Sequence, residues 1–264
     1  MAIVMGTLTA GIGSVWLAAF LSFGLLARYT QHLLSLAAGA LLATAFMHLL
    51  PEAFESQSSA HDLFLTLLVG LIFFFLLDKA ELWHHGHEHH HGAPPDVDQH
   101  PAHDPVKHAH GHAHQPGTWA VLTGDSVHCF GDGVLIASAF MADLRLGVIA
   151  SLAVLAHEVP HHMGDLMVLR SSTGNRQAAL LKVTLAGAVT PLGGLVGYWL
   201  VDRLQGYLPY FLVVASSSFV YVALADLIPQ LQKRLSARET AAQITWLLIG
   251  IAMVALASGL TSHH

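Results

Sequence analysis

Two apolar stretches near the middle of the chain each carry a cluster of imidazole and acidic side chains. One cluster reads HCFGD from His128 to Asp132, and the other reads HEVPHHMGD from His157 to Asp165. Ionisable groups are costly in hydrocarbon, and they usually persist there because an ion path, a proton relay or catalysis needs them. Histidine and aspartate are also ligands of divalent transition metals. The two clusters therefore predict a metal site buried within a membrane.

Helical spacing places these side chains on shared faces. Residues four apart lie on one face of a helix, so His128 and Asp132 should project together. The same spacing joins His157 to His161, and Asp165 continues that stripe. Each set begins about ten residues into its apolar stretch, which at roughly 1.5 Å per residue is about 15 Å, half the hydrocarbon thickness. The two sets are predicted to meet at mid-membrane.

Further ionisable residues flank this pairing. Glu158 and His162 form an adjacent stripe one residue round the second helix. Asp125 and Asp165 each lie about one turn inward of the site, where they could serve as exit ligands. Pro160 has no N–H and crowds the carbonyl four residues before it, so the second helix should kink there.

The composition is that of a membrane protein. Hydrophobic residues make up 54% of the chain, Asp, Glu, Lys and Arg together only 11%, and the mean hydropathy is +0.56. Soluble domains, in contrast, carry about a quarter charged residues. The formal charge of -6 argues against nucleic-acid binding, which requires a basic surface. The single cysteine excludes an internal disulfide framework. The first apolar run lacks the basic start of a cleaved signal and is expected to be a retained span.

Eight apolar stretches predict an all-α polytopic membrane protein with eight transmembrane helices. They are continuously apolar, which favours helices over the alternating strands of a barrel. With both termini extracytoplasmic, nine of the eleven Lys and Arg residues fall in inner loops, as the positive-inside rule requires. The approximate spans are 3–27, 33–54, 63–83, 118–142, 146–169, 178–201, 207–231 and 241–260.

These spans divide the chain into four parts: helices 1–3 in residues 1–83, a cytoplasmic loop in 84–117, helices 4–5 with the metal site in 118–170, and helices 6–8 in 171–264. The loop is rich in histidine and broken by proline, so it cannot bury a core and should be mobile. Its composition favours weak, exchangeable metal binding over a purely solubilising linker.

A short sequence in helix 2 is similar to one in helix 7. Helix 2 contains HLLPE, from His48 to Glu52, and helix 7 contains DLIPQ, from Asp226 to Gln230. The two helices run in opposite directions in the predicted topology, so the repeat would be inverted. Inverted repeats that flank a midplane site are common in secondary transporters, although chance similarity between two leucine-rich helices would explain five residues equally well. His48 and Glu52 lie toward the outer end of helix 2, where they could admit ions or form a polar cap.

The two central motifs resemble those of the ZIP (Zrt-/Irt-like) family of divalent-metal transporters. The HNxxDG pattern of its fourth helix is similar to HCFGDG at 128–133, and the HExPHExGD pattern of one branch is similar to HEVPHHMGD at 157–165. The HLLPE of helix 2, eight helices, outward termini and a histidine-rich third loop also look like ZIP members. The resemblance implies movement of Zn²⁺, and also of Cd²⁺, Fe²⁺ or Mn²⁺, into the cytoplasm by sliding one helix bundle against another.

The resemblance also implies a ligand set. The principal metal site would be formed by His128, Asp132, His157 and His161, and Glu158 would belong to an adjacent second site that shares His161.

Three departures from the family pattern bear on the second site. Cys129 stands where the family has asparagine, Thr190 where helix 6 often has an acid, and His162 where the branch has glutamate. We therefore expect one complete site and not a full binuclear centre. Cys129 is either a soft ligand that shifts preference toward Zn²⁺ or Cd²⁺ or a small buried hydrophobe.

Two alternatives stay open. His157-Glu158-x-x-His161 also fits HExxH, the pattern in which two histidines bind zinc and glutamate is the general base of a protease. Proline inside that motif and the extra ligands of helix 4 argue against an enzyme. A cation efflux transporter is the other alternative, although that class typically has six helices. The expected partners are the transported metal ions and the lipid bilayer, in a bacterial inner membrane; a homodimer is compatible with the sequence.

We expect metal uptake to fall as the pH drops through roughly 6.5, because histidine must lose its proton before it binds a metal. Initial rates of zinc uptake into proteoliposomes between pH 5 and 8 would check this (a range bracketing the ordinary titration of histidine, about 6.5). A rate that rises steadily toward acid pH would contradict it.

Overall fold

The computed structural model describes residues 1–22, 30–86, 117–231 and 236–261, and within these ranges all regular structure is helical. The predicted all-α class is confirmed for this part of the chain. The predicted loop lies outside the described residues between 87 and 116. In chain order the helices are α1 Ala2–Leu8, α2 Ser14–Ser22, α3 Thr30–Thr44, α4 Leu50–Phe54, α5 Ala60–Gly86, α6 Gly117–Ala142, α7 Leu144–Thr173, α8 Arg176–Gly187, α9 Val189–Arg203, α10 Leu208–Tyr221, α11 Ile228–Leu231 and α12 Ala237–Thr261.

Six helical stretches of the described residues are long and apolar enough to cross a membrane. They are Ala2–Ser22, Thr30–Phe54, Ala60–Leu77, Arg176–Arg203, Gln205–Ala225 and Ala237–Ala257. The two helices with the ionisable clusters, α6 and α7, are not among these six, although at 26 and 30 residues they are long enough. At about 1.5 Å per residue each exceeds the roughly 30 Å of a hydrocarbon core.

The two site helices are joined by a single residue, which makes them antiparallel neighbours. α6 ends at Ala142 and α7 begins at Leu144. The carboxylate of Asp143 between them accepts hydrogen bonds from the backbone N–H groups of Arg145 at 2.8 Å and Leu146 at 3.4 Å. It is thus an N-cap that fixes the start of α7. This short hairpin brings the two clusters to the same level.

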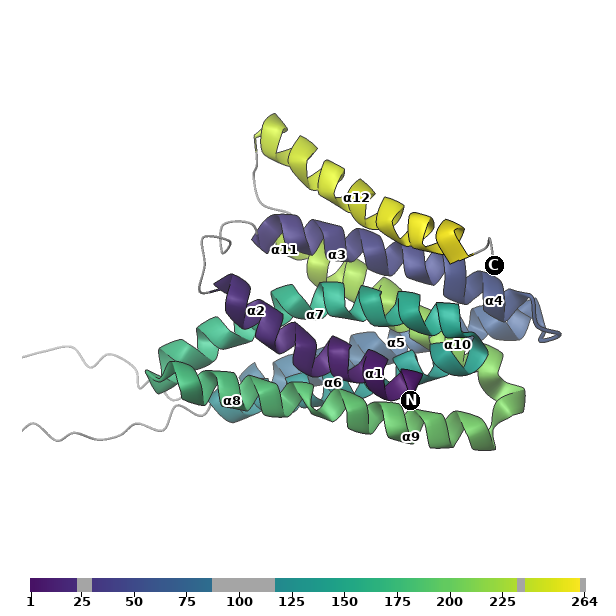
Figure 1. Cartoon of the computed structure of the whole chain (residues 1–264), viewed down its shortest axis with the longest axis horizontal. Coiled ribbons are helices and arrows are strands. Elements are labelled where there is room, and N and C mark those ends of the chain that lie inside the picture. Colours follow the sequence, from purple (N-terminus) through teal and green to yellow (C-terminus); the bar gives the residue numbers. More distant parts are fainter. Residues whose placement is uncertain (23–29, 87–116, 232–235, 262–264) are drawn as a thin grey trace, which may run out of the picture.

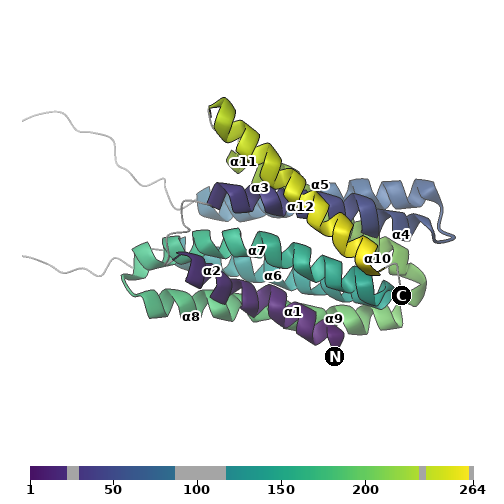
Figure 2. The ribbon, with the colours of Figure 1, turned by 45° about the horizontal axis from the view of Figure 1, so that its top comes forward.

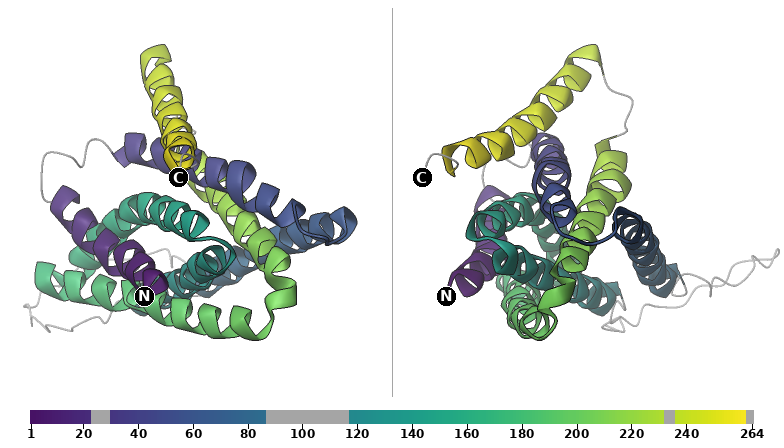
Figure 3. Two further views of the ribbon diagram at one scale, coloured as in Figure 1. Left: turned by 45° about the vertical axis from the view of Figure 1, so that its right-hand side comes forward. Right: turned by 90° about the vertical axis from the view of Figure 1, so that its right-hand side faces the viewer.

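The helices form two bundles, visible as separate layers in Figure 2. α1, α2, α6, α7, α8 and α9 pack on one another, and α3, α4, α5, α10, α11 and α12 form the second group. The two bundles meet mainly where α3 packs on α7 and α10 packs on α6. α12 lies at the outside of the second bundle and rests on α3 (Figures 1 and 3). Both site helices therefore belong to the same bundle.

The similar sequences of predicted helices 2 and 7 have similar local backbone structure. The helix that begins at α3 contains the π-helical turn Ala45–Leu49, and α10 is followed by the π-helical turn Val222–Leu227. Each turn precedes a proline, Pro51 or Pro229. Proline cannot donate the regular helical hydrogen bond, and a local π turn is one way to accommodate that loss. The similar sequences thus coincide with similar backbone, although the π-helical turn Thr9–Gly13 precedes no nearby proline. The inverted repeat stays a prediction.

Two prolines within other predicted spans have different effects. α8 ends at Gly187 and α9 begins at Val189, because the ring of Pro191 would crowd the carbonyl of Gly187 four residues before it. The predicted sixth helix is therefore divided in two. Pro160, in contrast, lies inside α7, which continues to its end at Thr173. The kink expected at Pro160 stays a prediction.

Glycines allow the closest contacts between helices. A Cβ atom at Gly39 of α3 would collide with the carbonyl oxygen of Leu247 of α12, and one at Gly250 of α12 would collide with the carbonyl oxygen of Leu36. Backbone atoms cannot turn aside as a flexible side chain can. The α3–α12 pairing therefore requires glycine at both positions.

Replacing Gly39 by alanine should lower the thermal unfolding midpoint in detergent, because α12 must move off α3 at a cost of about 1–3 kcal/mol. Gly164→Ala is the matched control, since a Cβ there would meet no neighbouring atom within 4 Å. Equal midpoints for the two variants would show that the close approach is not needed.

Candidate metal centre

Ionisable side chains of α6 and α7 lie in three overlapping groups, and in each the potential ligand atoms are within 4.8 Å of one another. We name each group by one member: the His128 group is His128, Asp132, His157 and Glu158; the Cys129 group is Asp125, Cys129, Glu158 and His162; and the His161 group is Asp125, His161 and Asp165.

The His128 group has the spacing of ligands around one ion. Nε2 of His128 lies 3.3 Å from Nε2 of His157, and Oε1 of Glu158 lies 3.2 Å from each of these nitrogens. Oδ2 of Asp132 lies 3.2 Å from His157 Nε2 and 3.9 Å from His128 Nε2. Zinc bonds to nitrogen and oxygen of about 2.0–2.2 Å place tetrahedral ligands about 3.3 Å apart. The four side chains could thus hold a zinc-sized cation with little movement.

This group is open on one side. His157 and Asp132 are each 2% exposed and Glu158 is 1% exposed, but the side chain of His128 is 27% exposed. An ion held here would be surrounded by protein except at His128. That arrangement suits a site that an ion enters and leaves.

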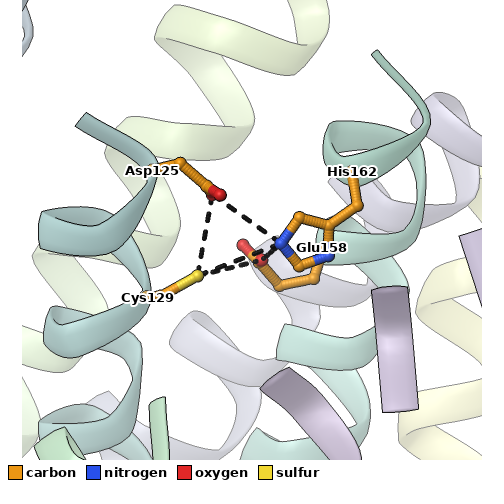
Figure 4. A group of neighbouring side chains, drawn as sticks. All are labelled: Asp125, Cys129, Glu158 and His162. Carbon is orange, nitrogen blue, oxygen red and sulfur yellow. Dashed lines mark hydrogen bonds and ion pairs between the residues drawn. The ribbon is translucent and has the colours of Figure 1, made fainter. Parts of the chain in front are cut away.

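The Cys129 group lies beside the first and is closed. Sγ of Cys129 lies 3.6 Å from Oδ1 of Asp125, 3.7 Å from Oε2 of Glu158 and 3.9 Å from Nε2 of His162. His162 Nε2 also lies 3.1 Å from Glu158 Oε2 and 3.7 Å from Asp125 Oδ1. Figure 4 shows the four side chains pointing toward one another, two from each helix. All four are buried.

The His161 group has a more exposed ligand. Nδ1 of His161 lies 3.4 Å from Oδ2 of Asp165 and 3.8 Å from Oδ1 of Asp125, and its side chain is 35% exposed. Its ring stacks on that of His128 with the centroids 5.5 Å apart. His161 therefore lies next to the first group while its Nδ1 faces the two aspartates.

Shared carboxylates connect the three groups. Glu158 uses Oε1 toward His128 and His157 and Oε2 toward His162, so its two oxygens belong to different groups. Asp125 belongs to both the Cys129 and the His161 groups. The ligands form one continuous ladder along α6 and α7.

The buried carboxylate oxygens in this ladder have few partners. Oδ2 of Asp125 has no hydrogen bond, and Oδ2 of Asp132, Oε1 of Glu158 and Oδ2 of Asp165 face histidine nitrogens at 3.2–3.4 Å. A buried carboxylate that lacks compensating partners is costly, and more so when it is charged. A bound divalent cation would remove that cost. The chemistry of the donor set therefore fits a metal ion.

The structure groups some predicted residues differently from the ligand set that the family resemblance implies. Glu158 belongs to the His128 group, whereas the resemblance implies that His161 completes that site. Nδ1 of His161 instead faces Asp125 and Asp165. Asp125 and Asp165 lie together in the His161 group, and their role as exit ligands stays a prediction. His48 and Glu52 lie on the second bundle, in none of the three groups formed by the described residues.

One polar neighbour of the site, Ser14, has no motif that identifies it. Its hydroxyl oxygen lies 3.1 Å from Nδ1 of His162, and Ser14 is fully buried at the start of α2. It immediately follows the π-helical turn Thr9–Gly13. The only sequence signal is a serine in an otherwise apolar run, which usually indicates helix packing.

The fold and the site are those of a helical membrane protein with buried groups of potential ligands for a divalent metal ion. A sequence model of the ZIP Zinc transporter family matches residues 1–258. The chain belongs to this family and is an integral membrane protein.

Individual relatives agree with this assignment. The zinc transporter ZIP13 of Mus musculus is 27% identical over 265 residues, which cover 86% of this chain and 70% of the relative. The ZIP13 homolog of Drosophila melanogaster is 27% identical over 88% of this chain and 78% of its own length. Human zinc transporter ZIP4 is 36% identical over 144 residues, which are 54% of this chain but only 21% of ZIP4. The chain thus spans only part of each relative, and about a fifth of ZIP4.

Proposed function

We propose that this protein carries divalent transition-metal ions, Zn²⁺ first among them, across the membrane into the cytoplasm. The observation that carries the proposal is the His128 group: two imidazoles and two carboxylates with near-tetrahedral spacing, buried except at His128. Cd²⁺, Fe²⁺ and Mn²⁺ are further candidate substrates. The family and its zinc-transporting relatives support this class of substrate.

Transport needs a site that binds an ion and then releases it. A closed tetrahedral site would hold zinc too tightly for turnover. The exposed side of His128 leaves a route for the ion. The carboxylates of Asp132 and Glu158 compensate the charge of an ion that has lost its water.

The ladder of ligands supplies a route onward from this site. We propose that the ion passes from the His128 group to the His161 group, where Asp125 and Asp165 accept it, and then leaves toward the histidine-rich segment. His161 is suited to the transfer because its ring stacks on that of His128 while its Nδ1 faces the two aspartates.

The two bundles give a basis for alternating access. Every ligand of the three groups lies on α6 or α7, within the first bundle. The site can therefore move as a unit relative to the second bundle without losing its ligands. We propose that such a displacement opens the His128 group to one side and then to the other.

The protease alternative requires His157 and His161 to bind one zinc. In the structure they fall in different groups, and the nearest partners of His157 are His128, Asp132 and Glu158. This separation favours transport over peptide hydrolysis. The direction of metal flux in oriented vesicles distinguishes uptake from efflux.

Replacing His128, Asp132 or His157 by alanine should abolish zinc uptake or reduce it severely, because each change removes a ligand from the His128 group. The measurement is zinc flux into proteoliposomes that contain equal amounts of folded protein, repeated with Cd²⁺, Fe²⁺ and Mn²⁺ to rank substrates.

Asp202→Ala is the matched control for Asp132→Ala, because Asp202 is an exposed residue near the end of α9. Normal uptake by all three site variants would refute the assignment of this group as the transport site. Peptide cleavage without metal flux would support the enzyme instead.

We further propose eight membrane-spanning helices with both termini outside the cytoplasm, in a bacterial inner membrane. The six apolar stretches together with α6 and α7 make up the eight spans, and the distribution of Lys and Arg supports the orientation. The predicted loop 84–117 then lies on the cytoplasmic side between helices 3 and 4, although residues 84–86 continue α5 and Gly117 begins α6.

Cysteine labelling tests this orientation. In a Cys129→Ser background, a membrane-impermeant maleimide should label Gln57→Cys in intact cells but label Gln177→Cys only after permeabilisation. Both glutamines are exposed, Gln57 after α4 and Gln177 at the start of α8. The opposite labelling pattern would reverse the topology.

A further inference from the structure

We propose that Ser14 is a positioning residue of the transport site. Through His162 it holds one oxygen of the Glu158 carboxylate, so that the other oxygen is presented to the ion in the His128 group. The inference rests on the proposed function, because the ion that Glu158 serves is the transported one. It adds a residue of α2 to the parts of the protein that set how tightly this ion is bound.

Three consecutive contacts link Ser14 to the His128 group. The hydroxyl oxygen of Ser14 lies 3.1 Å from Nδ1 of His162. The second nitrogen of that ring, Nε2, lies 3.1 Å from Oε2 of Glu158. The other oxygen of this carboxylate, Oε1, lies 3.2 Å from Nε2 of both His128 and His157. A change at Ser14 therefore reaches the transport site by moving one ring and one carboxylate.

The chemistry of each group agrees with this order. An ionised carboxylate only accepts hydrogen bonds, so the hydrogen between His162 and Glu158 is carried by Nε2 of the ring. A hydroxyl both donates and accepts, so Ser14 is a partner for Nδ1 whether or not that nitrogen carries a hydrogen. An apolar side chain at position 14 would leave Nδ1 without this partner.

The other neighbours of this pair hold it less firmly. Sγ of Cys129 lies 3.7 Å from Oε2 of Glu158, and a thiol is a weak donor. Oδ1 of Asp125 lies 3.7 Å from Nε2 of His162. Both distances are longer than the 3.1 Å between His162 and Glu158. The orientation of the Glu158 carboxylate thus depends mainly on the His162 ring.

Burial means that solvent cannot replace a lost partner. Ser14 and His162 are 0% exposed, and Glu158 is 1% exposed. A buried polar group without a hydrogen bond is costly, so the ring is expected to turn when the Ser14 hydroxyl is removed. Partners that orient the ligands of a metal ion without touching the ion change its affinity when they are lost.

The local backbone explains why Ser14 faces His162. Ser14 begins α2 immediately after the π-helical turn Thr9–Gly13. A Cβ atom at Gly11 of this turn would collide with the carbonyl oxygen of Gly187 in α8, so the turn lies directly against a neighbouring helix. The Ser14 hydroxyl is also within hydrogen-bonding distance of the carbonyl oxygen of Gly11. Single π turns within helices frequently occur at functional sites.

The expected effect is on binding of the ion and not on the later steps of transport. α2, α6 and α7 belong to the same bundle, so the contacts of Ser14 persist while the site moves. Removing the hydroxyl takes away the support of one ligand and leaves every ligand in place. A loss of binding alone raises KM and leaves the maximal rate nearly unchanged.

The first test measures zinc uptake into proteoliposomes against zinc concentration. Ser14→Ala should raise KM by about two- to tenfold, the worth of one net hydrogen bond, at a maximal rate close to that of the wild type. Ser14→Thr, which keeps the hydroxyl, should restore KM. Ser216→Ala is the matched control, because Ser216 is a buried serine of the second bundle whose hydroxyl donates to the carbonyl oxygen of Leu212 in its own helix. Equal KM values for Ser14→Ala and Ser216→Ala would overturn the inference.

A double-mutant cycle shows whether Ser14 acts through His162. The measurement is the zinc affinity of the purified, metal-free protein in detergent, determined by calorimetric titration. Ser14→Ala should weaken binding in the wild-type background and have no further effect in the His162→Ala background. The same fold-change in both backgrounds would mean that Ser14 acts through packing alone, and it would overturn the positioning role.

Failure of the proposed function is seen separately. Normal uptake by His128→Ala would refute the transport site whatever the zinc affinities of the Ser14 variants. Loss of uptake by His128→Ala together with equal zinc affinities for Ser14→Ala and the wild type would overturn only the role of Ser14.

Discussion

The arrangement of the whole protein depends on the burial of carboxylates between α6 and α7. Glu158 and Asp132 lie in a region where an uncompensated negative charge is strongly unfavourable. Histidines on both helices lie within hydrogen-bonding or ion-pairing distance of them, and a cation can replace those partners. Buried carboxylates need a positively charged partner. Because of this need, the site is costly to bury but can take a dehydrated divalent ion. The Glu158 carboxylate has one oxygen in each of two groups.

The surroundings of the site are compatible with its movement as a unit. Its ligands belong to one bundle, and small side chains occur in the cores where α3 packs on α7. On α3 these include Ala37 and Ala40, and on α7 they include Ala150 and Ala153. Small residues allow helices to approach closely without interlocking side chains. Close contact without interlocking is compatible with sliding, which the proposed alternating access requires.

Two residues that depart from the family pattern lie together in the structure. Cys129 and His162 both stand where the pattern has another residue, and taken singly each weakened the expectation of a second site. In space they face one another across the gap between α6 and α7, together with Asp125 and Glu158. The two departures thus lie in one buried group, whose potential donors include sulfur. The Ser14 hydroxyl, from a helix far away in sequence, lies beside His162 of this group.

The sequence by itself determined the helices, the two central motifs and the class of chemistry. Hydropathy and helical periodicity are local properties, so the helical class and the shared faces of residues four apart could be found in this way. The tertiary structure decided which donors lie together. Whether His157 pairs with Glu158 or His161, and whether Ser14 reaches His162, depends on side-chain rotamers and on the packing of α2 against α7. Those are long-range contacts, and one-dimensional spacing carries no information about them.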